Sequence, residues 1–273
     1  MKKTSVHQLL DRFDGFLLDA YGVLVDSRRP LPGANDFLRE LERRGKPYRI
    51  ISNDGSTTPE AKLARWAARG LQVNDGALLT PWTVLGSCFS PLELSGRKGF
   101  VLGTALSEEM FRRAGGIPVT EGELPEVLLV ADEMTPDFMA RCDLGLTLVV
   151  DAFRQGMKPE LVLVNPDLVY PSGQGYGFTA GAICLMFEAA LERLLGREVS
   201  FTRVGKPGTE LFEMGLEELG LERERVVMLG DQWATDVAGA RAAGLASVLL
   251  TTGLGEPDPA YPEQMILESL VFS

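Results

Sequence analysis

The sequence predicts an α/β protein in which a parallel β-sheet, covered by helices on both faces, is interrupted by a second α/β domain. Short apolar segments alternate with amphipathic helical segments in the first and the last third of the 273 residues. This alternation is typical of parallel sheets with helices on both faces. The middle of the chain contains further apolar strand candidates, so we expect it to form a domain of its own.

Two strands and two helices are expected in the first third. The strands are FLLDA at 16–20 and YRIIS at 48–52, and GANDFLRELERRGK between them has the apolar spacing of an amphipathic helix. A second helix is expected to begin after Thr58, which can cap it, with Pro59 in the first helical position. We expect this helix to end at Gly70.

The last third repeats the pattern. Thr209 is expected to cap a helix at 210–219, which Gly220 ends. The apolar strand VVMLG follows at 226–230, and after it come a small-residue helix, ATDVAGARAA, and a last strand, ASVLLTT. In sheets of this kind, ligands bind at the carboxyl ends of the strands.

The middle of the chain has its own strands and helices. GFVLG, EVLLVAD and LVLVN are strand candidates, and a helix is expected to begin at Thr135-Pro136-Asp137. We therefore predict a discontinuous core domain, formed by residues 1–80 and 200–273, and an inserted domain at 81–199.

Composition limits the function of the protein. The formal net charge is −11, which argues against nucleic acid or an anionic membrane surface as the main partner. No segment approaches the roughly 20 apolar residues of a membrane span, and the first residues lack the apolar region of a secretory signal. We therefore expect a cytoplasmic protein, whose three scattered cysteines are reduced core thiols.

The histidine content narrows the chemistry further. The sequence has one histidine, His7, which excludes Ser-His-Asp triads and Cys-His pairs. Catalysis would have to use carboxylates, lysine, hydroxyl groups or a hard metal ion such as Mg²⁺, which prefers oxygen ligands.

Polar residues of these types follow the strands of the predicted core domain. They are Asp19 in LLDAYG, Ser52 and Asn53 in IISND, Lys206 in VGKPG, and Asp231 and Asp236 in LGDQWATD. Each residue alone is better explained as a helix cap, a turn residue or a solvated side chain. Together, at the carboxyl ends of neighbouring strands, they indicate a phosphate and magnesium site with a carboxylate nucleophile.

Each residue fits a step of phosphoryl transfer. Asp19 can attack phosphorus and form an aspartyl-phosphate. Asp19 and Asp231 can share Mg²⁺, with the backbone carbonyl of Tyr21 as a third ligand. Asp236 can hold a metal-bound water or orient the other ligands. Phosphate oxygens can be received by Ser52, by the backbone N–H groups from Asn53 onward, and by Lys206.

These stretches resemble the motifs of the haloacid dehalogenase-like (HAD) superfamily. LLDAYGVL resembles the first motif, ISN the second, GKP the third and GDQWATD the fourth. Asp19 and Ser52 are 33 residues apart (52 − 19), too few for a domain, whereas Ser52 and Lys206 are 154 apart (206 − 52). This layout is similar to class IIA, the NagD-like phosphatases. The resemblance implies a Rossmann-like doubly wound core and a C2-type cap domain.

Tyr21 departs from the pattern of the superfamily. Its phosphatases usually carry an aspartic acid at this place, which protonates the leaving oxygen and then helps to deprotonate water. Tyrosine has a reference pKa of about 10 and is poorly suited to be a general base at neutral pH. Asp-Ala-Tyr-Gly resembles the haloacid dehalogenases instead. Those enzymes, however, carry their cap between the first two motifs and lack the acids that are retained here as Asp231 and Asp236.

We therefore expect a Mg²⁺-dependent phosphohydrolase or phosphotransferase that acts on a small phosphorylated metabolite. Two alternatives remain open: a protein that binds a phosphorylated ligand but turns it over poorly, and a carbon–halogen hydrolase. The cap is expected to select the substrate through the segment 165–181, which contains Asn165 and Asp167; a flexible linker is the alternative interpretation. A second copy of the chain, bound through the cap, is a further candidate partner.

Overall fold

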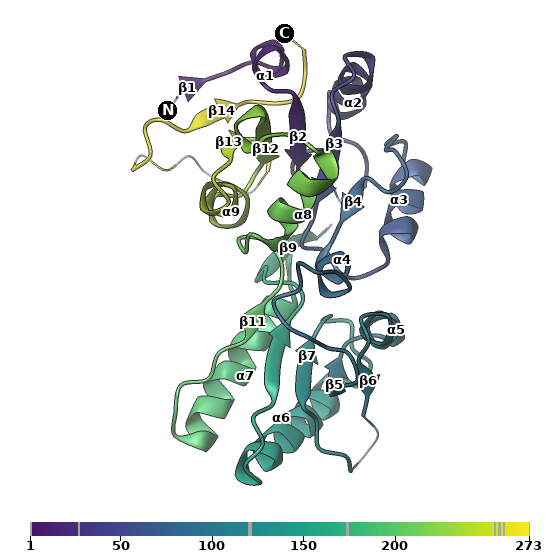
Figure 1. Cartoon of the computed structure of the whole chain (residues 1–273), viewed down its shortest axis with the longest axis vertical. Coiled ribbons are helices and arrows are strands. Elements are labelled where there is room, and N and C mark those ends of the chain that lie inside the picture. The colour runs from purple at the N-terminus through teal and green to yellow at the C-terminus, as the bar shows by residue number, and fades with distance from the viewer. Residues whose placement is uncertain are drawn as a thin grey trace. The chain divides into compact units, whose positions relative to one another are not determined.

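The chain folds into two compact units, coloured by residue number in Figure 1. The computed structural model describes residues 2–26, 28–119, 122–172, 175–253, 255, 258 and 260–272. The core unit consists of Met1–Ser52, Thr58–Thr80 and Lys206–Ser273. The inserted unit consists of Asn53–Thr57 and Pro81–Gly205.

This division differs from the predicted domain boundaries at two places. Residues 53–57 group with the inserted unit, where the carbonyl of Gly55 accepts a hydrogen bond from Nε1 of Trp82 at 2.8 Å. Residues 200–205 also group with it, because the short strand β11 (Thr202–Arg203) pairs with a strand of that unit.

A parallel sheet forms the centre of the core unit. Within the described residues it has seven strands in the order β1-β14-β13-β12-β2-β3-β4, and all pairings are parallel. The strands are β1 (Lys2–Lys3), β2 (Gly15–Leu18), β3 (Tyr48–Ile51), β4 (Leu78–Leu79), β12 (Val226–Gly230), β13 (Ala246–Leu250) and β14 (Met265–Leu267). The Rossmann-like parallel core that the sequence predicts is thus confirmed.

Helices cover this sheet. They are α1 (Val6–Arg12), α2 (Ala34–Arg43), α3 (Pro59–Ala68), α8 (Glu210–Leu219) and α9 (Ala238–Ala242), with a 3₁₀ turn at Arg223–Arg225 and a π-helical turn at Trp233–Val237. Thr58 caps α3 as predicted, because its side chain accepts a hydrogen bond from the backbone N–H of Ala61. The predicted cap at Thr209 is wrong. Its backbone is already helical and its side chain makes no capping bond.

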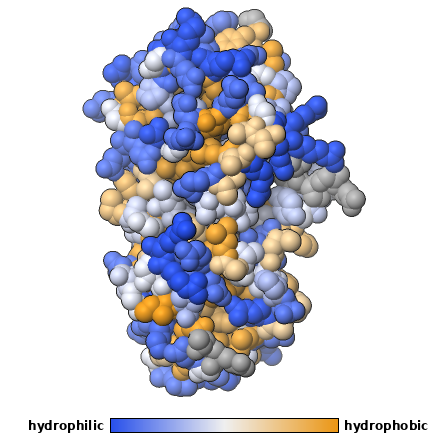
Figure 2. Space-filling view, turned by 90° about the vertical axis from the view of Figure 1, so that its right-hand side faces the viewer, coloured by the Kyte–Doolittle hydropathy of each residue, from blue (hydrophilic) through white to orange (hydrophobic). Residues whose placement is uncertain are grey.

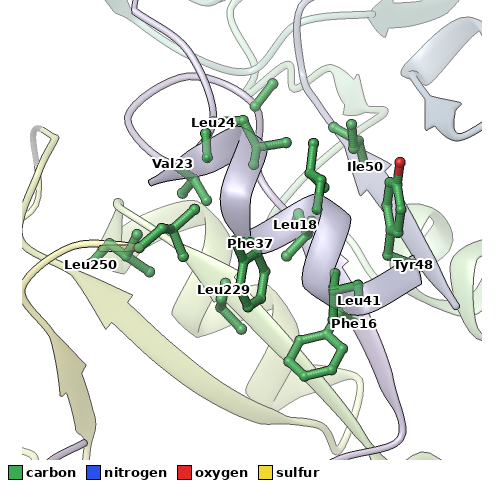
Figure 3. Close-up of a cluster of buried hydrophobic side chains, with 14 of the residues drawn as sticks. Phe16, Leu18, Val23, Leu24, Phe37, Leu41, Tyr48, Ile50, Leu229 and Leu250 are labelled. Carbon is green, nitrogen blue, oxygen red and sulfur yellow. The ribbon is translucent and has the colours of Figure 1, made fainter. Parts of the chain in front are cut away.

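The alternation of side chains along β2 explains why both faces of the sheet are covered. Phe16 and Leu18 point to one face, where they pack among Phe37 and Leu41 of α2 (Figure 3). Successive strand residues point to opposite faces, so Leu17 points to the other face, next to Gly215 of α8. A strand that is buried on both faces must be apolar throughout, as GFLL is.

The inserted unit is a second α/β structure. Its described residues form a parallel sheet in the order β11-β8-β7-β5-β6 and a separate antiparallel pair, β9 and β10. The remaining strands are β5 (Lys98–Leu102), β6 (Ile117–Pro118), β7 (Val127–Val130), β8 (Glu160–Leu163), β9 (Val169–Ser172) and β10 (Gly175–Phe178). The helices are α4 (Pro81–Leu85), α5 (Ala105–Arg113), α6 (Phe138–Arg154) and α7 (Ala180–Leu195).

The predicted start of α6 is wrong in its details. The helix begins at Phe138, and Asp137 at its N-cap has a positive φ of 49° and no side-chain capping bond. Thr135, where the helix was expected to begin, precedes it and donates its hydroxyl to the carbonyl of Asp132 at 2.9 Å.

One face of the protein (Figure 2) is mainly hydrophilic, and one of the three cysteines is exposed. Figure 2 shows a face on which hydrophilic side chains predominate and hydrophobic ones occur between them. Cys142 and Cys184 are buried thiols, as expected, but Cys88 is exposed, so the prediction that all three are core thiols is wrong. Among the described residues, none of the helices combines the length and apolar composition that crossing a membrane requires.

The core packing leads to a first prediction. Phe37 is fully buried and meets Phe16 edge to face, with ring centroids 5.6 Å apart. Phe37→Ala leaves a cavity and should destabilise the core unit by about 3–5 kcal/mol, lowering its thermal transition by about 10 °C in calorimetry. Glu42→Ala on the exposed face of the same helix is the control and should shift the transition by at most about 2 °C. Equal shifts in both variants would contradict this packing.

Candidate active site

Four of the predicted site residues meet in the core unit, at the carboxyl ends of β2 and β12. Asp19 follows β2 and Asp231 follows β12, and the two strands are neighbours in the sheet. Carboxylate oxygens of Asp19, Asp231 and Asp236 lie within 4.8 Å of one another. Nζ of Lys206 donates to Oδ1 of Asp19 at 2.5 Å and to Oδ1 of Asp236 at 2.6 Å. All four side chains are buried.

The backbone holds these carboxylates in place. The N–H of Asp19 donates to the carbonyl of Leu229 at 2.8 Å, which ties the end of β2 to β12. Oδ2 of Asp236 accepts the backbone N–H of Gln232 at 3.0 Å, across the π-helical turn. Gly22 has a φ of +81°, and a Cβ at this position would overlap the carboxylate of Asp231. Only glycine satisfies both conditions.

The electrostatics of the cluster follow from its burial. Burial raises the pKa of Asp19 well above its ordinary value; Asp236 and Asp231 add to this rise, whereas the Lys206 ammonium opposes it. Burial opposes the charged form of Lys206 too, but the carboxylates of Asp19 and Asp236 outweigh it and hold the pKa of Lys206 above its usual range. Lys206 is therefore a stable cation at neutral pH.

The donor set fits a hard divalent cation. Three buried carboxylates face a single ammonium group, so the cluster has an excess of negative charge when it is fully ionised. Its donors are oxygen atoms, which Mg²⁺ and Ca²⁺ prefer. Both oxygens of Asp236 already accept hydrogen bonds, from Lys206 and from Gln232, so Asp19 and Asp231 are the better candidates for direct ligands.

Two further predicted residues lie in the core unit. Ser52 is buried directly after β3, and its N–H donates to the carbonyl of Leu79 at 3.1 Å. Tyr21 is partly buried, and its ring packs edge to face against Trp66 of α3, with centroids 6.3 Å apart at 78°. The side chain of Tyr21 is thus held by the aromatic packing of the core unit.

The remaining predicted residues form a second polar group, in the inserted unit. Nδ2 of Asn53 donates to Oδ1 of Asp167 at 3.0 Å. The N–H of Asp167 donates to Oδ1 of Asn165 at 3.1 Å, and the hydroxyl of Thr179 donates to the carbonyl of Asp167. Asp167, which the sequence suggested as a substrate contact, therefore binds the residue that follows Ser52.

Most of the described residues of the segment 165–181 form regular secondary structure, which contradicts the interpretation of the segment as a flexible linker. It contains the antiparallel pair of β9 and β10 and the first residues of α7. Gly173 and Gln174 lie outside the described residues.

Sequence reasoning missed the loop that follows β13. The hydroxyl of Thr252 donates to the carbonyl of Gly22 at 2.5 Å, and a Cβ on Gly253 would overlap the carboxylate of Asp231. The available signal was the sequence Thr-Thr-Gly directly after the last strong strand, at the same edge of the sheet as the four motifs.

The sequence of the chain is similar to known hydrolases. Two family models match: one described as HAD-hydrolase-like over residues 203–271, and one described as haloacid dehalogenase-like hydrolase over residues 16–116. The chain is 31% identical to glycerol-3-phosphate phosphatase from Rattus norvegicus over an alignment of 282 positions, gaps included, which covers 94% of this chain and 84% of that protein. It is 26% identical to ribonucleotide monophosphatase NagD from Escherichia coli (strain K12) over 245 residues, 89% of each.

A solved structure has the same fold. The structure of a glycerol phosphate phosphatase from Mycobacterium tuberculosis in complex with calcium matches with a TM-score of 0.77 and 22% identity, over 98% of this chain and 75% of that one. A parallel α/β sheet with carboxylates at its strand ends, a lysine bound to two of them and relatives named as phosphatases identify the class, a hydrolase of the α/β type. The chain belongs to the haloacid dehalogenase-like hydrolases, in their class IIA or NagD-like group, as the four motifs predicted.

The buried ion pairs lead to a second prediction. Lys206→Met leaves three buried carboxylates without their cation, which should cost about 3–5 kcal/mol and lower the melting temperature by about 10 °C at neutral pH. A raised carboxyl pKa means that the folded state binds protons more readily than the unfolded one. The loss should therefore grow as the pH rises above 3.8, the ordinary value of Asp19.

Thermal unfolding at pH 5 and at pH 8 measures this difference. Lys98→Met, which removes an exposed lysine paired with Glu123, is the matched control and should have a small effect at both values. A deficit of Lys206→Met that is the same at both pH values would contradict the charge imbalance.

Proposed function

We propose that the protein is a Mg²⁺-dependent phosphohydrolase that cleaves a small phosphorylated metabolite through an aspartyl-phosphate on Asp19. The observation that carries this proposal is the buried cluster in which Lys206 binds Asp19 and Asp236 while Asp231 lies within 4.8 Å of both carboxylates. Relatives named as phosphatases of small phosphorylated compounds support it.

The chemistry assigns two steps to Asp19. Its free carboxylate oxygen attacks phosphorus, a P–O bond to Asp19 forms, and the bond to the leaving oxygen breaks as that oxygen takes up a proton. Water then attacks the aspartyl-phosphate, which releases inorganic phosphate and restores Asp19. Burial of Asp19 excludes bulk water from the first step.

The other residues of the site would compensate the negative charge of the phosphate and of the carboxylates. Lys206 holds Asp19 in position and is a permanent cation next to the phosphoryl group. Ser52 and the backbone N–H of Asn53 are placed in sequence to donate to phosphate oxygens at the end of β3. Asp19, Asp231 and the backbone carbonyl of Tyr21 would hold Mg²⁺, with Asp236 supporting them. The ion supplies positive charge that offsets repulsion between carboxylate and phosphate.

Tyr21 favours a second candidate function. No carboxylic acid follows Asp19 by two residues, and the ring at this position packs against Trp66. A protein with this equipment can bind a phosphorylated ligand and turn it over slowly. Binding of a phosphate ester without Mg²⁺-dependent hydrolysis would identify this function, and chloride release from a 2-haloacid without Mg²⁺ would identify carbon–halogen hydrolysis.

We further propose that the core unit is the catalytic domain and the inserted unit is a C2-type cap that selects the substrate. Asn165 and Asp167 remain the proposed substrate-side residues. The exposed aromatic rings of Tyr176 and Phe178, 77% and 74% exposed, support contact of the cap with a ligand or with a second copy of the chain. Sedimentation of the purified chain tests the dimer.

The central test of the proposal is hydrolysis of simple phosphate esters. The wild type should release phosphate from p-nitrophenyl phosphate and glycerol phosphate only when Mg²⁺ is present, and Asp19→Asn should reduce release to the background of the assay. Acid quenching of the wild type with radiolabelled substrate should retain label on the protein, because an acyl phosphate survives acid. Label retained equally by Asp19→Asn would place the nucleophile elsewhere.

A second variant tests the metal ligands. Asp231→Asn should raise the Mg²⁺ concentration that gives half-maximal turnover by about tenfold or more. Asp36→Asn, on the exposed surface of α2 next to Arg39, is the control and should leave this concentration unchanged. Equal metal requirements in the two variants would remove Asp231 from the site.

The role of Tyr21 gives a further prediction. Acid–base assistance is worth about 10²–10⁴-fold, and it matters most for poor leaving groups. Tyr21→Asp should therefore raise Mg²⁺-dependent turnover of alkyl phosphates more than that of aryl phosphates. Tyr21→Asn loses the same ring contact but supplies no acid, so it is the matched control, and circular dichroism should show both variants folded. A folded Tyr21→Asp that is no faster than Tyr21→Asn would show that a missing acid does not limit turnover.

A further inference from the structure

A cationic pocket lies in the inserted unit, between the ends of two neighbouring helices. Its volume is about 310 Å³. It is formed by the last turn of α6, the loop that follows, and the end of α7; the side chains that line it are Phe153, Arg154, Met157, Lys158, Leu195 and Arg197. Three of these six are cations and none is a carboxylate, in a chain with a net charge of −11.

The pocket lies at the carboxyl-terminal ends of α6 and α7. After α6, Gly156 has a φ of +83°, its N–H donates to the carbonyl of Phe153 and the N–H of Met157 donates to the carbonyl of Ala152, both at 3.0 Å. This pair of bonds closes the helix and turns the chain back. The helices pack side by side on one face of the sheet (Figure 1), so the end of α7 meets this turn.

One of the three cations of the pocket, Arg154, has a weak, solvent-exposed carboxylate partner, and Lys158 has no ion pair among the described residues. Lys158 is exposed. Arg197 lies over the ring of Phe153, 4.8 Å from its centroid. Arg154 reaches Asp151 only at 3.9 Å, and both side chains are largely exposed. Helix C-termini attract cations within the last turn, which accounts for Arg154 but not for Lys158 and Arg197, which lie beyond the helix ends.

We propose that this pocket binds a small organic anion with two or more phosphate charges and an apolar part, of the class of nucleoside diphosphates. Lys158, Arg154 and Arg197 would receive the phosphate oxygens, and the apolar part would lie against Met157 and Leu195. The volume is at the lower end of the range for small-molecule sites.

The pocket is separate from the polar group of Asn53, Asn165 and Asp167 in the same unit. Lys158 lies just before β8 and Asn165 lies just after it, so the strand separates them by roughly 20 Å. A ligand in the pocket therefore cannot touch the polar group of Asn53 and Asp167, and the proposal does not depend on the proposed hydrolysis.

Titration of the full-length, ¹⁵N-labelled chain tests the pocket. The probe is the α,β-methylene analogue of adenosine diphosphate, which resists hydrolysis. The backbone amide signals of Gly156 and Gly196, which flank the pocket, should shift and saturate. Lys158→Glu and Arg154→Glu, both exposed and therefore expected to fold, should each weaken this binding by about tenfold or more. Arg113→Glu, on α5 of the same unit, should leave it unchanged.

Two reference compounds separate the contribution of the phosphate groups to binding from that of the apolar part. Adenosine alone should not shift these signals, and methylenediphosphonate should bind more weakly than the nucleotide analogue. The proposal is overturned if the analogue leaves Gly156 and Gly196 unshifted, or if Lys158→Glu binds it as tightly as Arg113→Glu does. Equal affinity for methylenediphosphonate and the analogue would overturn the apolar part of the assignment.

Discussion

The hydrogen-bonded ion pairs of Lys206 with Asp19 and Asp236 are the interaction on which the rest of the core unit's site depends. Three carboxylates within 4.8 Å of one another, all buried, would repel strongly without a cation. Lys206 binds two of them at once, at 2.5 and 2.6 Å, and thereby fixes one oxygen of Asp19. One ammonium group cannot balance three carboxylates, however. The same contact that permits the cluster to fold thus leaves it with an affinity for further positive charge, which is what a site for a divalent cation requires.

The fold brings these charges together through its strand order. In the sheet, β2 lies between β12 and β3, with Leu18 level with Leu229 on one side and with Ile50 on the other. The residues that follow these strands must therefore emerge at one edge, whatever their distance in sequence. The loop after β13 reaches the same edge, because Thr252 binds the carbonyl of Gly22. The apolar strands, buried on both faces, do not contribute chemistry themselves; they hold the polar ends that do.

Much of this arrangement could be predicted from the sequence, because it is local. The periodicity and length of the apolar segments predicted both ends of α8 and of β12 correctly. The spacing of the motifs predicted the family. What could not be predicted depends on contacts between distant residues. Asn53 and Asp167 are 114 positions apart, and no periodicity signals that their side chains bind each other or that residues 53–57 join the inserted unit. The cap expected at Thr209 failed for a related reason, since a threonine before a helix can hydrogen-bond several groups and its tertiary surroundings decide which.

Position 21 shows why a motif needs its structural surroundings to be interpreted. In the sequence, Tyr21 stands out only as the absence of an acid. In the structure its ring is partly buried against the hydrophobic core of the core unit. It contacts Trp66, which is 1% exposed, edge to face. Aromatic contacts of this kind stabilise by about 0.5–1.5 kcal/mol beyond the area they bury. An aspartic acid at this position would therefore lose packing in return for a proton donor. The tyrosine has a structural reason to be there, independent of catalysis, and its presence alone is not an argument that Asp19, the proposed nucleophile, is inactive.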